Sequence, residues 1–329
     1  MSIAIERMHV PAGDVPRTIA PSRNFADRLY RGLATGAGLT TLAILFLIGL
    51  FLVLSSLRAF RDVGFAFFSA PKVWNPDLRK FGIGAVLYWT VVVSVIALLV
   101  AVPISIACAL FITEYAPRRI RRWLTALIDL LAAIPSVIYG IWGLAFLQPH
   151  FVEVSGWLTK NLGFIPIFAT DSANYSGSAF IIGVVLAMMV VPICTSVMRE
   201  VFSQTPPGEK EAALALGSSR WGMIRAVVLP FGRGGIIGGA MLGMGRALGE
   251  TIAVALLVSP VFTISPHILQ SGSNSIAALI ANYFSEASVG HGIPALLAAG
   301  LALFVLTLVV NFLASIVVSR SRSGTGVEI

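Results

Sequence analysis

The chain of 329 residues is 57% hydrophobic and only 12% charged, whereas a soluble domain usually carries about a quarter charged residues. Together with a mean hydropathy of +0.89, this composition argues against an ordinary soluble enzyme and predicts an all-α polytopic membrane protein. The formal net charge of +8 is therefore expected in loops beside membrane spans, and not on a nucleic-acid-binding face.

Six long apolar runs follow a polar segment, residues 1–32, which we expect to be a mobile amino tail. Each run approaches or exceeds the roughly 20 residues that an α-helix needs to cross a bilayer. The pattern predicts a six-span domain over 33–319 and a short carboxyl tail at 320–329. The runs are centred on 33–57, 84–112, 124–147, 178–198, 234–258 and 293–319.

Lysine and arginine are unevenly distributed between the two sets of loops. Sixteen lie in the two tails and in the second and fourth loops, whereas six lie in the first, third and fifth loops. By the positive-inside rule both termini are expected in the cytoplasm. The first loop, with five basic residues, goes against the rule, but the larger number of basic residues in the tails and in the second and fourth loops decides the predicted orientation.

Few polar residues inside the runs suggest chemistry. Cys108 and Cys194 both lie in apolar runs and are expected to be small packing residues. The four histidines are scattered, so no metal site is predicted. Asp129 in the third run could line a pathway, could be satisfied by a neighbouring helix, or could lie near the cytoplasmic interface.

The residue pattern of the fourth loop, at 199–233, predicts a short helix, a sharp turn and a second helix. Thr205 and Pro206 form a plausible helix start. Gly217 can take the left-handed conformation that ends a helix, and Ser218 or Ser219 can cap the next one, which runs to Pro230. Alanines give the first helix a small, exposed side that another protein could approach closely. An ordinary amphipathic interfacial loop is the alternative.

The order of residues in this loop resembles the EAA loop of type I ABC importer permeases, the MetI-like core fold. Val227 stands where that family usually has isoleucine. The resemblance implies that the loop docks on a separate ATPase subunit. No Walker A sequence is present, so this chain is expected to be no enzyme and to bind no cofactor, with ATP and magnesium used by the ATPase. The matching residues are Glu211, Ala212, Ala213, Gly217, Val227, Leu229 and Pro230.

Two ionisable residues, Arg246 and Glu250, lie in the fifth apolar run. On a continuous α-helix they would be about 40° apart on one face. Glycines at 235, 239 and 243 give that helix a side without bulk, where another helix or a substrate could approach. The two residues could form a structural ion pair, or they could line a route for an anion.

Phosphate would suit an arginine–glutamate pair better than sulfate. Arginine presents several N–H donors in a planar fork, which fits a tetrahedral oxyanion. A nearby carboxylate would repel a fully deprotonated anion, but it could accept a hydrogen bond from a protonated oxygen. Phosphate keeps at least one proton at neutral pH, and sulfate keeps none.

The segment GRALGET (245–251) is similar to one found in both membrane subunits of the phosphate-specific ABC importer. Two further segments, LLAAIPSVIYGIWG (130–143) and ALFITEYAP (109–117), are similar to its C-type subunits, the PstC family. The resemblance implies a place in the bacterial inner membrane and roles for Arg246 and Glu250 in phosphate passage. It also implies three partners: an A-type sister permease (PstA-like), an ATPase dimer (PstB-like) and an extracytoplasmic phosphate-binding protein (PstS-like).

Other functions stay open on the residues alone. The importer could carry sulfate, molybdate or phosphonate instead of phosphate. A proton-coupled secondary anion transporter could use Glu250, although it would have no use for an ATPase-docking loop. A non-transporting membrane scaffold would keep Arg246 and Glu250 as a structural pair only.

Overall fold

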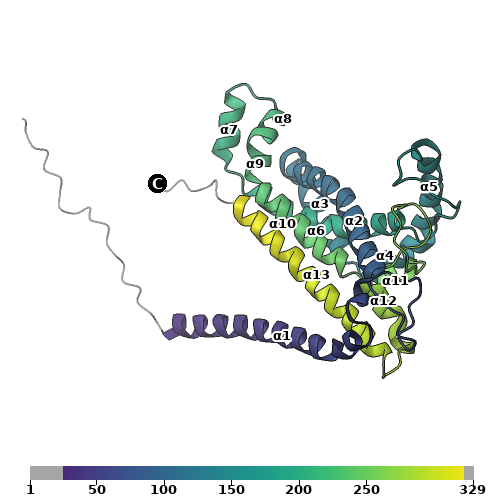
Figure 1. The fold of residues 1–329 in the computed structure, drawn as a ribbon. Helices are drawn as coiled ribbons and strands as arrows, with labels where there is room; N and C mark the ends of the chain where they lie inside the picture. Colours follow the sequence, from purple (N-terminus) through teal and green to yellow (C-terminus); the bar gives the residue numbers. More distant parts are fainter. Residues whose placement is uncertain (1–24, 322–329) are drawn as a thin grey trace, which may run out of the picture. The chain divides into compact units, whose positions relative to one another are not determined.

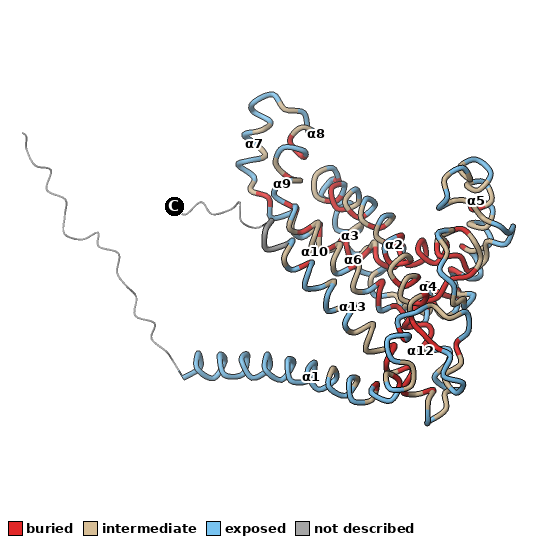
Figure 2. Tube along the Cα trace, in the orientation of Figure 1, coloured by how far each residue is buried: buried red, intermediate tan, exposed pale blue. Residues whose placement is uncertain are grey.

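A computed structural model describes residues 25–321, with side chains as far as Val317. Over this range the chain is helical apart from turns, loops and two isolated β bridges. It divides into two compact units, residues 1–48 and 49–329. Helix α1 (Phe25–Val63) starts before the predicted residue 33, and its residues 25–48 are all exposed (Figure 2). The remainder of the predicted amino tail, 1–24, and most of the carboxyl tail, 322–329, lie outside the described residues.

The core of the second unit is the contact between α2 (Gly84–Leu110) and α6 (Ala179–Ser203). Both helices are rich in apolar residues on every side, as expected of a span buried among other spans. A Cβ atom at Gly183 would lie only 2.5 Å from Cγ2 of Ile96, so this glycine lets the two backbones come close. Pro103 and Pro192 lie inside α2 and α6, which continue past them.

Helices α3 (Arg118–Ala132) and α10 (Arg233–Leu248) pack on this pair, and α13 (Gly292–Ser321) packs on α10 (Figure 1). Helix α10 contacts both α2 and α6, and α3 lies against α6. The helical segment that follows α3 comprises α4 (Ser136–Trp142), a π-helical turn and α5 (Gln148–Leu162).

The all-α membrane fold predicted from the composition is confirmed. Five described helical segments are long and apolar enough to cross a membrane, and a sixth span results if Arg220–Phe231 and Arg233–Leu248, which meet at 65°, count as one.

Two predicted runs are nevertheless not single helices. The run at 124–147 is divided at Pro135, which lacks an N–H donor and keeps the preceding residue away from helical geometry. The run at 234–258 is divided between α10 and α11 (Ile252–Leu257).

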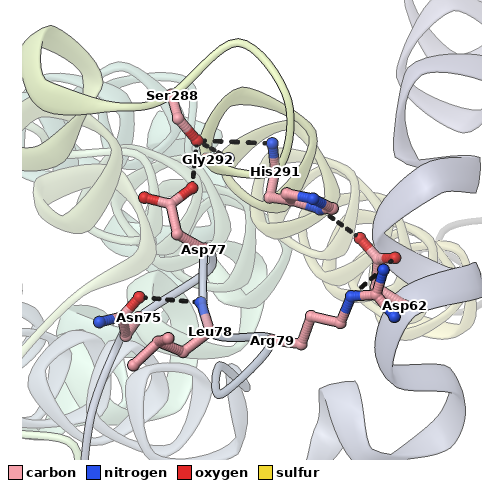
Figure 3. Close-up of polar contacts among 8 residues, drawn as sticks. All are labelled: Asp62, Asn75, Asp77, Leu78, Arg79, Ser288, His291 and Gly292. Carbon is pink, nitrogen blue, oxygen red and sulfur yellow. Dashed lines mark hydrogen bonds and ion pairs between the residues drawn. The ribbon is translucent and has the colours of Figure 1, made fainter.

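A polar network joins the end of α1, the segment between α1 and α2, and the residues that precede α13 (Figure 3). Asp62, near the end of α1, pairs with Nδ1 of His291 at 2.8 Å and lies 3.7 Å from Nε of Arg79. Ser288 donates a hydrogen bond to Asp77. These contacts tie the segment between α1 and α2 to the start of α13, and they give Arg79, one of the basic residues of the first loop, an acidic partner.

Candidate functional site

Arg246 and Glu250 do not share a helix. α10 ends at Leu248, and Gly249 follows as its last cap. Oε1 of Glu250 accepts a hydrogen bond from the backbone N–H of Ala253 at 3.2 Å, in the first turn of α11. The expected continuous helix is thus corrected: a carboxylate that satisfies a free N–H at a helix start competes with continuation of the preceding helix.

The two side chains also differ in burial. Glu250 is 7% exposed, whereas Arg246 is exposed. Within residues 25–321 no ion pair joins them, and the Arg246 side chain makes no hydrogen bond to the described residues. The structural ion pair considered from the sequence is therefore not formed within the described part of this chain.

The glycine side of α10 is occupied by α6. A Cβ atom at Gly243 would lie 2.6 Å from Cγ1 of Val190 and 2.7 Å from Sγ of Cys194. The Cys194 thiol donates a hydrogen bond to the carbonyl of Gly239 at 3.1 Å. Of the two expectations for this side, close approach of another helix is the one observed, and Cys194 is the packing residue predicted.

A second broken segment lies against the first. A Cβ atom at Gly140 in α4 would come within 2.8 Å of Cα of Ala253 in α11. The Tyr139 hydroxyl donates to the carbonyl of Leu131 at 2.9 Å, near the end of α3, and it lies within electrostatic reach of Arg246. Sequence reasoning did not single out Tyr139 as a residue of this region. The only signal was its position in the Tyr-Gly-x-Trp-Gly string of 139–143.

The fourth loop has the predicted helix–glycine–helix form. Helix α7 (Pro207–Ala215) is followed by Gly217, whose φ of +84° favours glycine. Oγ of Ser219 then accepts a hydrogen bond from the N–H of Gly222 at 3.1 Å. The second helix runs through α8 (Arg220–Met223), a π-helical turn (η4, Ile224–Val228) and α9 (Leu229–Phe231). Thr205 gives no side-chain cap to α7.

The face of this loop is open in the isolated chain. No residue of α7 is buried. Glu211 and Ala212 are exposed, and Ala213 is half-buried. Two apolar residues nearby, Leu214 and Leu216, are 46% and 90% exposed. Exposed leucines beside small alanines form a surface that suits a docking partner.

Asp129 has a partner on a neighbouring helix. Its Oδ1 lies 3.8 Å from Nη1 of Arg199 in α6, and the Asp129 side chain is 51% exposed. Of the alternatives for this residue, the structure supports satisfaction by a neighbouring helix. Among residues 25–321, no three histidine, cysteine, aspartate or glutamate side chains are grouped as ligands for a metal ion.

Comparisons with known proteins connect this architecture to transport. The phosphate transport system permease protein PstC 2 of Mycobacterium tuberculosis is 38% identical over 308 residues, which cover 92% of this chain and 95% of that protein. PstC of Xylella fastidiosa is 40% identical over 298 residues, 90% of this chain and 91% of that protein. PstC of Mycobacterium leprae is 41% identical over 302 residues, 91% and 93% respectively.

A solved chain of a bacterial alginate ABC transporter has the same fold. The TM-score is 0.59 at 20% identity, and the match covers 93% of this chain and 100% of that chain. Residues 101–323 match the binding-protein-dependent transport system inner membrane component family. The chain therefore belongs to this family of ABC transporter permeases, and within it to the PstC-type subunits.

Proposed function

We propose that this chain is the C-type permease subunit of an ATP-driven importer for inorganic phosphate and forms half of its translocation pathway. The relatives that support this are named phosphate transport system permease proteins. The observation that supports the proposal most directly is the environment of Arg246. Its side chain is exposed beside the break between α10 and α11 and forms no hydrogen bond or ion pair in the described part of the chain. An arginine at the membrane centre costs at least about 2.5–3.5 kcal/mol, which an anionic substrate would offset.

Glu250 supplies selectivity in this proposal. Its Oε1 is used by the N–H of Ala253, which holds the carboxylate at the start of α11. Its Oε2 forms no hydrogen bond in the described residues and can accept one from a protonated phosphate oxygen. Sulfate carries no such proton, so the same carboxylate repels it. Arg246 provides the donors for the other oxygens.

The proposed assembly has three partner components besides this chain. An A-type sister permease (PstA-like) completes the pathway, and an ATPase dimer (PstB-like) docks on α7 and α8. An extracytoplasmic phosphate-binding protein (PstS-like) delivers the substrate. Both termini face the cytoplasm of a bacterial inner membrane. The ATPase binds ATP and magnesium and hydrolyses the ATP, and this chain binds neither.

In the proposed cycle, ATP binding closes the ATPase dimer and displaces the segment 205–217. The spans then open outward and accept phosphate from the binding protein. Hydrolysis returns the pathway to its inward-open state, and Arg246 holds phosphate only transiently on the way.

Labelled phosphate uptake tests the proposal in cells that lack their own high-affinity system. The cells carry this chain with the three partner components, and sulfate, molybdate or a phosphonate is added in excess as competitor. Arg246→Gln is the test variant. Arg233→Gln is the control, because it removes an exposed arginine from the first turn of the same helix.

We expect uptake that requires a functional ATPase, ignores the competitors, disappears in Arg246→Gln and persists in Arg233→Gln. Competition by another oxyanion would assign that oxyanion as substrate. Uptake that needs no ATPase but collapses with an uncoupler would identify a proton-coupled carrier. Full uptake by Arg246→Gln, at equal membrane levels, would remove Arg246 from the pathway.

A further inference from the structure

A partly buried ion pair joins α7 to the end of the α2 segment. Nζ of Lys210 in α7 donates to Oε1 of Glu114 at 2.7 Å. The Glu114 side chain is 7% exposed and that of Lys210 is 20% exposed. The two residues are distant in sequence, so the contact joins the fourth loop to a different part of the bundle.

Glu114 lies in a π-helical turn, η2 (Phe111–Tyr115), that ends the long α2 segment. π-helical turns are rare and are frequent at functional sites. Nη2 of Arg121 donates to the carbonyl of Thr113 in the same turn. Glu114 and Lys210 also line a cavity of about 340 Å³ together with Arg121, Arg199 and Glu200. The pair therefore lies at the wall of a polar cavity.

A second contact joins the same two parts of the chain. The guanidinium carbon of Arg220, the first residue of α8, lies 5.6 Å from the centre of the Tyr115 ring. Tyr115 follows Glu114 directly, and Arg220 follows the turn at Gly217. The helices α7 and α8 are thus each attached to η2 through a basic side chain.

The ion pair is the stronger attachment. α7 has no buried residue, so little apolar packing fixes it against the bundle. A carboxylate as buried as Glu114 is costly to leave without a counter-charge, whereas α7 buries no residue fully and loses little apolar packing when it moves. η2 contacts α2, which packs on both α6 and α10, so a chain of direct contacts connects η2 to the helix that carries Arg246.

We propose that the Lys210–Glu114 pair transmits the movement of α7 to α2, and that these are positioning residues for coupling ATP hydrolysis to transport. This inference rests on the proposed function. The neighbouring contact between Arg220 and Tyr115 sets the orientation of the loop, and the ion pair carries its displacement.

Four forms of the chain separate this role from a structural one. Lys210→Met removes the cation and leaves Glu114 buried without its partner. The reversed pair, Glu114→Lys with Lys210→Glu, keeps a pair of opposite charges at the same place. Glu200→Gln is the control, because Glu200 lines the same cavity but its carboxylate bonds only to the side chain of Gln204 in the described residues. The fourth form is the wild type.

Hydrogen–deuterium exchange of the backbone amides of α7 is measured first, on the purified chain in detergent without partners. Loss of the pair is expected to speed exchange by at least about tenfold in Lys210→Met. The reversed pair is expected within about threefold of the wild type. If the amides of α7 exchange at the same rate in Lys210→Met as in Glu200→Gln, the ion pair does not hold α7 against the bundle. This conclusion holds whether or not the chain transports phosphate.

The number of phosphate ions imported per ATP hydrolysed is measured next, in proteoliposomes holding the complete transporter. A structural defect lowers the rate of phosphate import and the rate of ATP hydrolysis together, so the ratio of the two is unchanged. We expect the ratio to fall at least about tenfold in Lys210→Met and to recover in the reversed pair. An unchanged ratio in Lys210→Met would overturn the inference. A wild type that imports no phosphate would instead overturn the proposed function.

Discussion

Replacing Gly243 by alanine is expected to force α10 away from α6, and Gly238→Ala provides a matched control in the same helix. The new methyl group at 243 would lie 2.6 Å from Val190 and 2.7 Å from Cys194, both of which are fully buried and have no space to yield. A methyl group at 238 meets no atom within 4 Å. Both changes add the same helix propensity, up to about 1 kcal/mol, so this gain cancels in the comparison.

The difference in unfolding free energy between the two variants is then the cost of forcing one methyl group into the packed contact between α10 and α6, about 1–3 kcal/mol. Gly243→Ala should therefore have a free energy of unfolding lower than that of Gly238→Ala by this amount. The melting temperature should be lower by roughly 2 °C for each kcal/mol. Because Gly243 lies one helical turn before Arg246, we also expect slower phosphate uptake in Gly243→Ala at equal membrane levels.

Thermal unfolding of the two purified variants in the same detergent gives the difference in stability, and uptake in cells gives the functional effect. Melting temperatures that agree within the equivalent of about 0.5 kcal/mol would show that α6 does not press on α10 at this glycine. A Gly243→Ala protein more stable than Gly238→Ala would refute the packing described here outright.

Three further changes have clear expected outcomes. Gly217→Ala strains the left-handed turn after α7 by about 1–2 kcal/mol, so less ATPase subunit should co-purify than with the control Gly208→Ala, which has open space around it. Glu250→Leu leaves an N–H of α11 unpaired and should lower stability by about 1–3 kcal/mol, whereas Glu250→Gln keeps an acceptor and should melt close to the wild type. Trp89→Phe removes the indole donor to the carbonyl of Thr263 at 2.9 Å and should lower the melting temperature by an equivalent of about 1–3 kcal/mol; an unchanged value would mean that water replaces the bond.

The candidate site was only partly predictable from the sequence. The order of residues in the fourth loop predicted its helix, glycine turn and second helix, because each of these signals acts within a few residues. The continuous helix expected to carry both Arg246 and Glu250 was predicted wrongly. Four residues apart, they can pair on one helix or the glutamate can cap the next helix, and the two arrangements differ by little in local energy. Packing of α11 against α4 selects the second.

Hydropathy and short-range spacing were sufficient to assign the membrane class, the approximate spans and the family resemblance, because both reflect the solvent around each segment. Which groups meet across long separations depends instead on the packing of the helices. The glycines of α10 face α6, Asp129 pairs with Arg199, and Lys210 pairs with Glu114. A charged residue in an apolar segment needs a partner, but its local pattern does not say which one. That choice depends on how the helices pack, because packing alone brings residues nearly a hundred positions apart within hydrogen-bond distance.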